Sequence, residues 1–337
     1  MSWIKLLRTK PTPFKLKYNI FNYSQIEKSK LLYLVPNIKK ELEIRISHRI
    51  YDLDTLPYGF SNIPQIVNVK KLYIESFNTI NNNKYSIIDS HELLNEFIYD
   101  IENIKNNHLT ISKDIGTALQ FNKNELTNTI KSHHINTILD KFYSSRIGIR
   151  TLITYLIDLN NGNNLVNYSC KPYNIINDSI IDAKNICMLT YGYSSDVELY
   201  LDNKFSFTYI DSHLYYIFFE ILKNSMEANI KNNSDTPIKI YMSQGDDDII
   251  FKVTDTGGGF CRHKLDDVFS YSYTTSMGGV NNNSTKLSGY GYGLPLSRVY
   301  ARYFEGDLKL IPFEGHGTDT FIYLNRLGNG EENIIFG

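Results

Sequence analysis

The sequence has few cysteines, no long apolar run and almost no net charge, and each of these absences excludes a class of protein. Its three cysteines, Cys170, Cys187 and Cys261, are odd in number and widely spaced, so neither a disulfide framework nor a zinc site is indicated. No apolar run reaches about 18 residues, which excludes an ordinary transmembrane helix. A formal net charge of −1 argues against a dominant surface for nucleic acid or an anionic membrane.

The first 28 residues are basic. Five basic residues precede the first acid, Glu27, and residues 1–28 therefore predict a basic leader, either a mitochondrial transit segment or a disordered extension.

Glycine is scarce in the first half of the chain, where apolar residues instead recur with helical spacing. Apolar residues stand three and four positions apart in segments 29–50, 64–80, 90–108, 110–130 and 134–159. This spacing predicts a helical bundle of the four-helix type over 29–162, with residues 160–164 as the connection to a second domain.

The second half alternates between strand-like and helix-like segments. ELYLDN and FSFTYI have strand alternation, HLYYIFFEILKNSMEANI has helical spacing with Asp211 or Ser212 placed to cap it, and IKIYMS followed by DIIFKVTD predicts a β-hairpin. A short helix, LSRVYARYF, precedes two further strands, DLKLIPF and TDTFIYLN. Helices on one side of a mixed sheet predict a two-layer α/β domain over 172–327, followed by a tail over 328–337.

Two short pieces of this second half place polar groups where a nucleotide could use them. Glu220 and Asn224 lie four residues apart on one helix face with Lys223 beside them, and a carboxylate and an amide oxygen can activate a nucleophile and hold a hard cation such as Mg²⁺. In DTGGGF, Asp255 follows a strand, where it could accept a hydrogen bond from an exocyclic amine. The glycines after it would let a planar ring approach the backbone.

Two glycine-rich turns accompany these pieces. In LSGYGYGLPLSR three glycines stand before an expected helix, where backbone N–H groups could meet phosphates. GHGT, residues 315–318, separates two strands, and FSYSYTTSMGGVNNNSTK has the composition of a mobile lid. Each piece taken alone is at least as often an ordinary helix face, turn or loop, so only their combination indicates a nucleotide site.

The order of these pieces resembles that of the GHKL ATP-binding superfamily, and more closely that of the mitochondrial 2-oxo-acid dehydrogenase kinases. FFEILKNSMEA, FSYSYTTS, GYGYGLPLSRVYARYFEGDLKL and EGHGTDTFIYL resemble motifs of the family's ATP domain, and ELEIRISHRIYDLDTLP and LDKFYSSRIGIRTL resemble segments of its helical domain. The resemblance, which covers most of residues 30–327, implies a kinase of the mitochondrial matrix that uses ATP and Mg²⁺ to phosphorylate a serine of the E1α subunit of a dehydrogenase complex. It also implies docking on a lipoyl-bearing domain of the E2 core and a homodimer formed through the ATP domains.

The resemblance assigns roles to individual residues. It implies that Glu220 is the general base for the serine hydroxyl, that Asn224 is the Mg²⁺ ligand and that Asp255 anchors adenine. Thr318 is expected near the base. The other residues implied to contact the nucleotide are Lys223, Glu227, Gly257, Gly259, Thr274, Thr275, Gly289, Tyr290, Gly291, Tyr292, Gly293 and Leu294.

Some positions depart from the family pattern and affect the expected substrate. Pyruvate dehydrogenase kinases have a histidine four residues before the base, whereas this chain has Tyr216, as branched-chain 2-oxo-acid dehydrogenase kinases do, and His213 lies one turn too far back. The short C-terminal ending also favours the branched-chain kind, while FYSSRIGIR and FSYSYTTS favour the pyruvate kind. We therefore expect a branched-chain complex as the substrate, with the pyruvate complex as the alternative.

Other departures bear on regulation and on competing functions. Glu227 stands where the family usually has arginine, and Tyr155 and Leu156 replace the usual Gln-His or His-His. A histidine autokinase is a second hypothesis, but the pair His133–His134 lacks the acid and proline that usually follow a phospho-acceptor. An ATP-gated conformational module is a third, and it would suit a longer chain with a transducer domain. Intact Glu220 argues against a non-catalytic binder.

Overall fold

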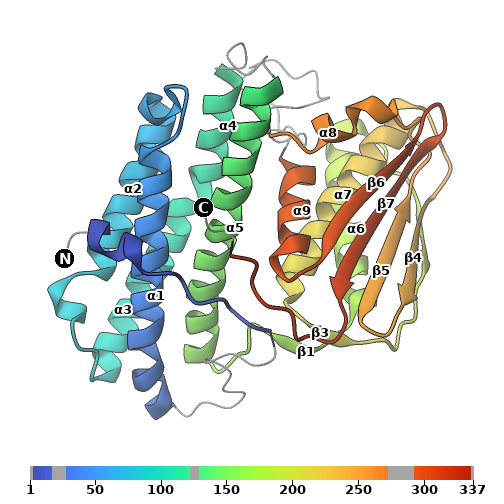
Figure 1. Cartoon of the computed structure of the whole chain (residues 1–337). Coiled ribbons are helices and arrows are strands. Elements are labelled where there is room, and N and C mark those ends of the chain that lie inside the picture. The colour runs from blue at the N-terminus through green and yellow to red at the C-terminus, as the bar shows by residue number, and fades with distance from the viewer. Residues whose placement is uncertain (1–2, 17–27, 122–128, 272–291, 335–337) are drawn as a thin grey trace. The chain divides into compact units, whose positions relative to one another are not determined.

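The computed structural model describes residues 3–16, 28–121, 129–271 and 292–334, and these residues form two compact units (Figure 1). The first, here called the helical unit, extends to Leu165. The second, the α/β unit, runs from Val166 to Asn333 and also includes Lys15 and Leu16. The change from one unit to the other after Leu165 falls in the interval between the two predicted domains.

Five α-helices make up most of the described helical unit. The elements are η1 (Trp3–Arg8), α1 (Lys28–Asp54), η2 (Phe60–Asn62), α2 (Pro64–Ile80), η3 (Asn83–Tyr85), α3 (His91–Asn107), η4 (His108–Thr110), α4 (Ile111–Phe121) and α5 (Thr129–Asn160). α1 packs on α2 and α5, α3 packs on α2 and α5, and α4 packs on α2 (Figure 1). The predicted stripe Leu42, Ile46 and Ile50 of α1 is buried, which confirms the helical spacing as the source of this core.

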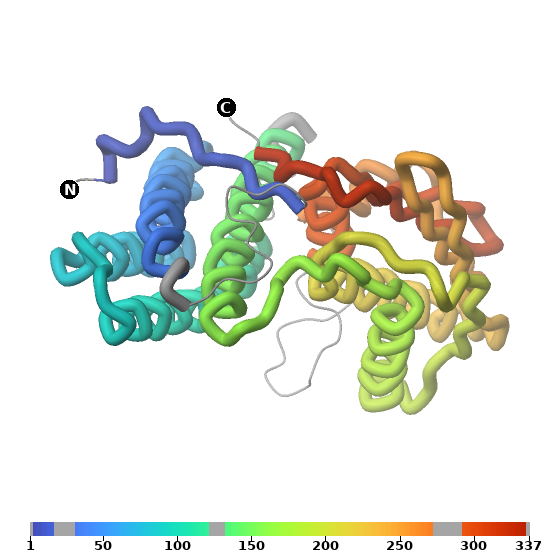
Figure 2. Tube along the Cα trace, turned by 90° about the horizontal axis from the view of Figure 1, so that it is seen from below, coloured from blue at the N-terminus to red at the C-terminus, as the bar shows by residue number. Residues whose placement is uncertain are grey.

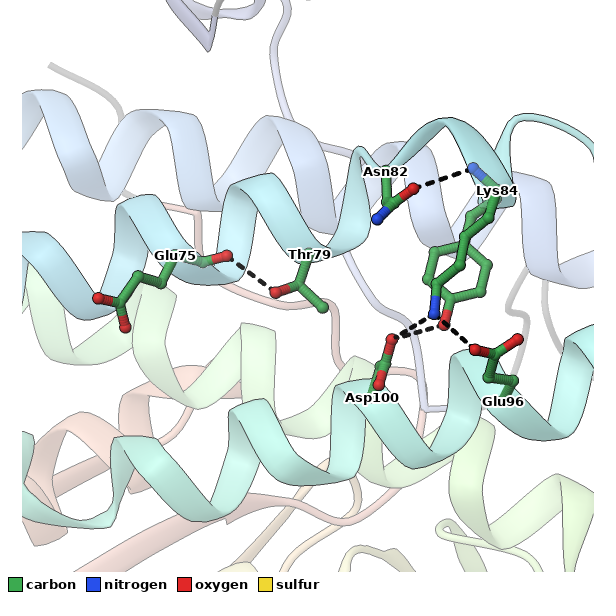
Figure 3. A network of polar contacts seen from close by, with 7 residues as sticks. Glu75, Thr79, Asn82, Lys84, Glu96 and Asp100 are labelled. Atoms are coloured by element: carbon green, nitrogen blue, oxygen red, sulfur yellow. Dashed lines mark hydrogen bonds and ion pairs between the residues drawn. The ribbon is translucent and has the colours of Figure 1, made fainter.

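A polar network closes the turn between α2 and α3 (Figure 3). Asn82 caps η3 by accepting a hydrogen bond from the backbone N–H of Lys84 at 3.0 Å. The Lys84 ammonium in turn lies 2.6 Å from Glu96 and 3.3 Å from Asp100 on α3. The buried Tyr85 ring places its hydroxyl to donate to the same Asp100. The Asp100 carboxylate of α3 therefore contacts the side chains of both Lys84 and Tyr85 in the turn.

Residues 9–16, within the predicted leader, are packed rather than separate from the folded units. In the helical unit, the backbone N–H of Thr12 donates to Glu41 at 2.8 Å, and Arg45 donates to the Thr12 carbonyl at 2.8 Å. In the α/β unit, the Leu16 N–H donates to the Gly330 carbonyl at 3.2 Å, so this segment lies beside the C-terminal segment (Figure 2). The import role of residues 1–28 stays a prediction.

The α/β unit consists of a mixed sheet with helices on one face. Its elements are β1 (Asn167–Cys170), α6 (Pro172–Tyr191), β2 (Val197–Tyr200), β3 (Phe207–Tyr209), α7 (Asp211–Lys231), β4 (Ile238–Gln244), β5 (Asp248–Thr254), η6 (Arg262–Lys264), α8 (Leu265–Val268), α9 (Gly293–Tyr303), β6 (Asp307–Phe313) and β7 (Gly317–Asn325). The described five-stranded sheet has the order β2-β4-β5-β7-β6, in which only the β2–β4 pair is parallel, and β1 pairs with β3 separately. α6, α7 and α9 lie on one face of this sheet (Figure 1).

Alternation along the strands separates the two faces of the sheet. Ile249, Phe251 and Val253 of β5 are buried, and Phe251 meets Phe218 of α7 edge-to-face at 5.2 Å. The predicted class, a helical bundle followed by a two-layer α/β domain with a mixed sheet, is confirmed. The capping prediction for α7 is wrong, because Ile210 occupies the cap and Asp211 instead accepts hydrogen bonds from the Asn167 amide. None of the described helices combines the length and apolar character that a membrane crossing requires.

Candidate active site

Helix α7 packs on α9 (Figure 1). The predicted base and metal ligand on α7 lie near the first residue of α9. The Glu220 carboxylate lies 2.7 Å from the Lys223 ammonium, and both side chains are largely buried, with 13% and 11% exposed. Gly293, the first residue of α9, lies so close that a Cβ added to it would collide with Glu220 Oε2 and stand 3.6 Å from Asn224 Nδ2. The N-terminus of α9 therefore approaches both side chains, and a side chain at position 293 would require the Glu220 carboxylate to move.

A second cluster surrounds Asp255 at the end of β5. Its side chain is 5% exposed and accepts hydrogen bonds from the Ser225 hydroxyl at 3.0 Å, the Gly257 N–H at 3.0 Å and the Thr318 N–H at 3.1 Å. Burial raises the pKa of Asp255, although the three hydrogen bonds oppose that shift. An oriented, nearly dry carboxylate of this kind is a strong acceptor for a ligand amine.

The glycines of the DTGGGF turn are required by close backbone packing. A Cβ on Gly257 would collide with the Ala228 side chain and stand 2.8 Å from that residue's backbone carbonyl carbon. Gly259 has φ +59° and faces the carbonyl oxygens of Phe313 and Gly317. The turn between β5 and η6 is thus pressed between α7 and the hairpin that joins β6 to β7, and bare backbone is needed on both sides.

Some of the other residues predicted to contact the nucleotide lie in the described parts of the chain and some do not. Thr274, Thr275, Gly289, Tyr290 and Gly291 lie outside the described residues. Tyr292 is buried immediately before α9, and Leu294 lies in the first turn of α9. Glu227 forms an ion pair of 2.7 Å with Lys231 on its own helix. Thr318, expected near the base, places its backbone N–H at Asp255, and its role toward Glu220 stays a prediction.

The histidine that the sequence places too far from the base is buried among aromatic rings. His213 lies 4.9 Å from the Tyr300 ring and 5.9 Å from the Phe304 ring, measured between centroids. Burial lowers the pKa of His213 to about 3, so its imidazole is neutral. Tyr216, at the family's histidine position, packs on the same Tyr300 ring at 4.6 Å. The part of α7 that precedes Glu220 is thus held against α9 by ring contacts.

Four residues support the Asp255 cluster, and of these only Gly317, in the GHGT turn, could be singled out from the sequence. Ser225 and Ala228 contact Asp255 and Gly257, as described above, from the α7 turn that follows Asn224. Asn229 is fully buried, accepts a hydrogen bond from the Thr256 N–H at 3.0 Å and donates one to the Thr236 carbonyl at 3.2 Å. Gly317 packs directly on the Asp255 carbonyl. The only signal for the first three was their place on the helix next to Asn224.

The residues fit a metal that is bound mainly through a nucleotide. No group of three or more His, Cys, Asp or Glu side chains suited to a metal occurs in the described parts of the chain. Mg²⁺ commonly keeps several waters and takes one or two protein oxygens together with substrate phosphates. The Asn224 amide, whose Nδ2 atom would stand 3.6 Å from a Cβ on Gly293, could supply one such oxygen without a dedicated protein cage.

Comparisons with known proteins match both units. Residues 13–177 match the family model described as mitochondrial branched-chain alpha-ketoacid dehydrogenase kinase, and residues 210–327 match the histidine kinase-, DNA gyrase B-, and HSP90-like ATPase. A mitochondrial pyruvate dehydrogenase (acetyl-transferring) kinase of Arabidopsis thaliana is 34% identical, over 96% of this chain and 93% of that protein. The corresponding kinase of Schizosaccharomyces pombe is 32% identical over 88% and 89%, and isozyme 1 of Rattus norvegicus is 30% identical over 95% and 78%. The expected preference for a branched-chain complex is not supported by these relatives, which favour the pyruvate alternative.

Proposed function

The chain belongs to the mitochondrial 2-oxo-acid dehydrogenase kinases and is a protein kinase that takes its phosphoryl group from ATP. We propose that the acceptor of this phosphoryl group is a serine of the E1α subunit of the pyruvate dehydrogenase complex. The proposal follows the names of the relatives rather than the two sequence features, Tyr216 and the short ending, that favoured the branched-chain complex. We also propose location in the mitochondrial matrix, since the relatives are mitochondrial.

One observation supports the nucleotide site most directly. A single helix, α7, faces the N-terminus of α9 with Glu220 and Asn224 and meets the Asp255 turn with Ser225 and Ala228. A nucleotide whose adenine amine bonds to Asp255 would extend its phosphates along α7 toward α9. Backbone N–H groups at a helix N-terminus favour phosphate, and the absence of a side chain at Gly293 keeps them accessible.

The proposed chemistry follows from these groups. The serine oxygen attacks the γ-phosphorus while the bond from phosphorus to the bridging oxygen breaks, and ADP leaves. Glu220 accepts the serine proton in that step, and Lys223, 2.7 Å from its carboxylate, holds the carboxylate in place. When bound, Mg²⁺ would neutralise phosphate charge, and Asn224 is the residue proposed to hold it. Most of the rate enhancement then comes from positioning and charge neutralisation, as phosphoryl transfer generally requires.

A homodimer through the ATP-binding units is proposed on the face of the sheet opposite the described helices α6, α7 and α9 (Figure 1). One register row across this face carries Tyr200, Tyr241, Lys252, Phe321 and Lys309. The rings of Tyr200 and Tyr241 stack at 4.7 Å, and Tyr200 is half exposed. A second copy would cover this aromatic row. Docking of a lipoyl-bearing domain of the E2 core is proposed from the family resemblance alone.

Incubation with labelled ATP and each purified dehydrogenase complex tests the proposed substrate. We expect label on E1α of the pyruvate complex and little on that of the branched-chain complex. Label on the branched-chain subunit alone would reverse the substrate assignment. Label on neither subunit would contradict the function, and label on the kinase's own histidines would favour the histidine autokinase instead.

Two variants separate binding from chemistry. Asn224→Ala should abolish Mg²⁺-dependent ATP binding in calorimetry while leaving thermal unfolding cooperative. Glu220→Gln should keep ATP binding but lower the transfer rate by at least about 10²-fold, the usual effect of losing a general base. Wild-type rates in Glu220→Gln would remove Glu220 from the mechanism, and unchanged ATP affinity in Asn224→Ala would remove the metal role.

A further inference from the structure

Two buried tyrosines, one directly before and one directly after residues 272–291, contact each other. Tyr271 and Tyr292 are 2% and 6% exposed, and their rings meet edge-to-face with centroids 5.3 Å apart at 78°. Such a pair stabilises the packing of the two rings beyond the area that it buries. Because Tyr292 immediately precedes Gly293, the contact acts on the residue from which α9 begins.

A second contact joins the same two chain segments, between the residue two positions before Tyr271 and the residue six positions after Tyr292. The Arg298 guanidinium of α9 lies over the Phe269 ring, 4.5 Å from its centroid. Arg298 also lies 3.1 Å from Asp307 of β6, and Arg302 reaches that same carboxylate at 2.8 Å. Among the contacts of the described residues, Arg298 but not Arg302 reaches the segment that ends at Tyr271, which makes the two arginines a matched pair for experiment.

The position of α9 matters because its first residue lies against the proposed base. A Cβ added to Gly293 would reach Glu220 Oε2, so a shift of this helix end changes the distance between its backbone N–H groups and the α7 face. Misplacement by about 1 Å can lower an enzymatic rate by about 10²-fold. Contacts that hold this end are therefore positioned to control phosphate binding.

We propose that Tyr271, Tyr292, Phe269 and Arg298 form an aromatic clamp that positions the N-terminus of α9 for the nucleotide phosphates. This inference rests on the proposed nucleotide site. The four side chains are positioning residues, because they act through the α9 backbone rather than by touching the reacting atoms. The clamp should affect ligands that carry phosphates and leave the adenine side, held by Asp255, unchanged.

The test compares ATP with adenosine, which has the base but no phosphates. Tyr271→Leu should weaken ATP binding about 3- to 10-fold, since 1.4 kcal/mol corresponds to about tenfold, and should leave adenosine affinity unchanged. Tyr271→Phe keeps the ring and should restore wild-type ATP affinity. Equal losses for both ligands, or no loss for ATP, would overturn the clamp.

Matched variants keep the test informative if the leucine variant does not fold. Arg298→Met should weaken ATP selectively, whereas Arg302→Met, which loses a contact to the same Asp307, should not. Tyr209→Leu removes a buried ring stacked at 5.3 Å on Phe207 and should lower stability without changing ATP affinity. Equal ATP affinities for the Arg298 and Arg302 variants would overturn the clamp.

Asn224→Ala, measured in the same assay, distinguishes a failure of the clamp from a failure of the proposed nucleotide site. If this variant loses ATP binding while Tyr271→Leu and Arg298→Met retain it, the clamp is wrong and the nucleotide site stands. If Asn224→Ala and Asp255→Asn both bind ATP like the wild type, the nucleotide site itself is wrong.

Discussion

The substitution Asp255→Asn tests the proposed adenine contact with little disturbance of the fold. Asp255 Oδ1 accepts hydrogen bonds from the backbone N–H groups of Gly257 and Thr318, at 3.0 and 3.1 Å, and Oδ2 accepts one from the Ser225 hydroxyl at 3.0 Å. An asparagine retains the oxygen that serves the two backbone groups. Its NH₂ group can donate to the hydroxyl, which accepts as readily as it donates. The local network therefore survives the change.

The expected loss of affinity follows from the acceptor that disappears. A hydrogen bond to a charged group contributes roughly 1.5–3 kcal/mol, and 1.4 kcal/mol corresponds to about tenfold in affinity. We therefore expect ATP to bind roughly 10- to 100-fold more weakly to Asp255→Asn. The carboxylate is only 5% exposed, so water cannot readily replace the lost contact and the larger values are favoured.

Calorimetry with ATP and with inosine triphosphate provides the assay. Inosine triphosphate carries a carbonyl oxygen where ATP carries the exocyclic amine, so the wild type should prefer ATP. Asp255→Asn should lose that preference, because its amide NH₂ can donate to the carbonyl. Thermal unfolding checks that the variant is folded. An unchanged ATP affinity, or an equal loss for both nucleotides, would refute the assignment of Asp255 to adenine.

Three further predictions follow from individual contacts. Gly257→Ala should destabilise the protein by roughly 1–3 kcal/mol in urea unfolding and weaken ATP binding, because the new methyl group meets the Ala228 backbone; wild-type stability would contradict this packing. The pKa of His213 is about 3 in the folded state, below its ordinary value of 6.5, so the unfolded state binds a proton more readily. The neutral buried imidazole therefore contributes fully to the free energy of unfolding above about pH 6.5, and this contribution is lost as the pH falls toward 3. His213→Phe should therefore remove a slope of up to about 1.4 kcal/mol per pH unit from the urea stability profile in that window, and identical slopes would refute it. Asp100→Asn should cost about 1–3 kcal/mol, since the buried Tyr85 hydroxyl loses a charged acceptor, and the loss should be smaller in a Tyr85→Phe background.

The sequence predicted those elements whose buried faces repeat regularly. The α1 stripe of Leu42, Ile46 and Ile50 could be recognised because each residue faces the same core. Helix α6 was not identified, because its exposed side includes Ile181, Met188 and Leu189, which blur the contrast between the two faces. The pairing of residues 15–16 with 330–331 could not be anticipated either, since it depends on contacts between opposite ends of the chain rather than on any local pattern.

The candidate site shows the same division between local and distant contacts. Glu220 and Asn224 could be grouped from their spacing alone, because four residues bring two side chains onto one helix face. Their relation to Gly293 depends on α7 and α9 meeting, across about 70 residues of sequence, and no spacing rule encodes that contact. Ser225 is adjacent to Asn224 in sequence but points toward Asp255, because neighbouring helix positions diverge by about 100°. A helix that contacts two ligand-binding loops must use two adjacent faces. The residues on its second face can be identified only once the packing of the loops is known.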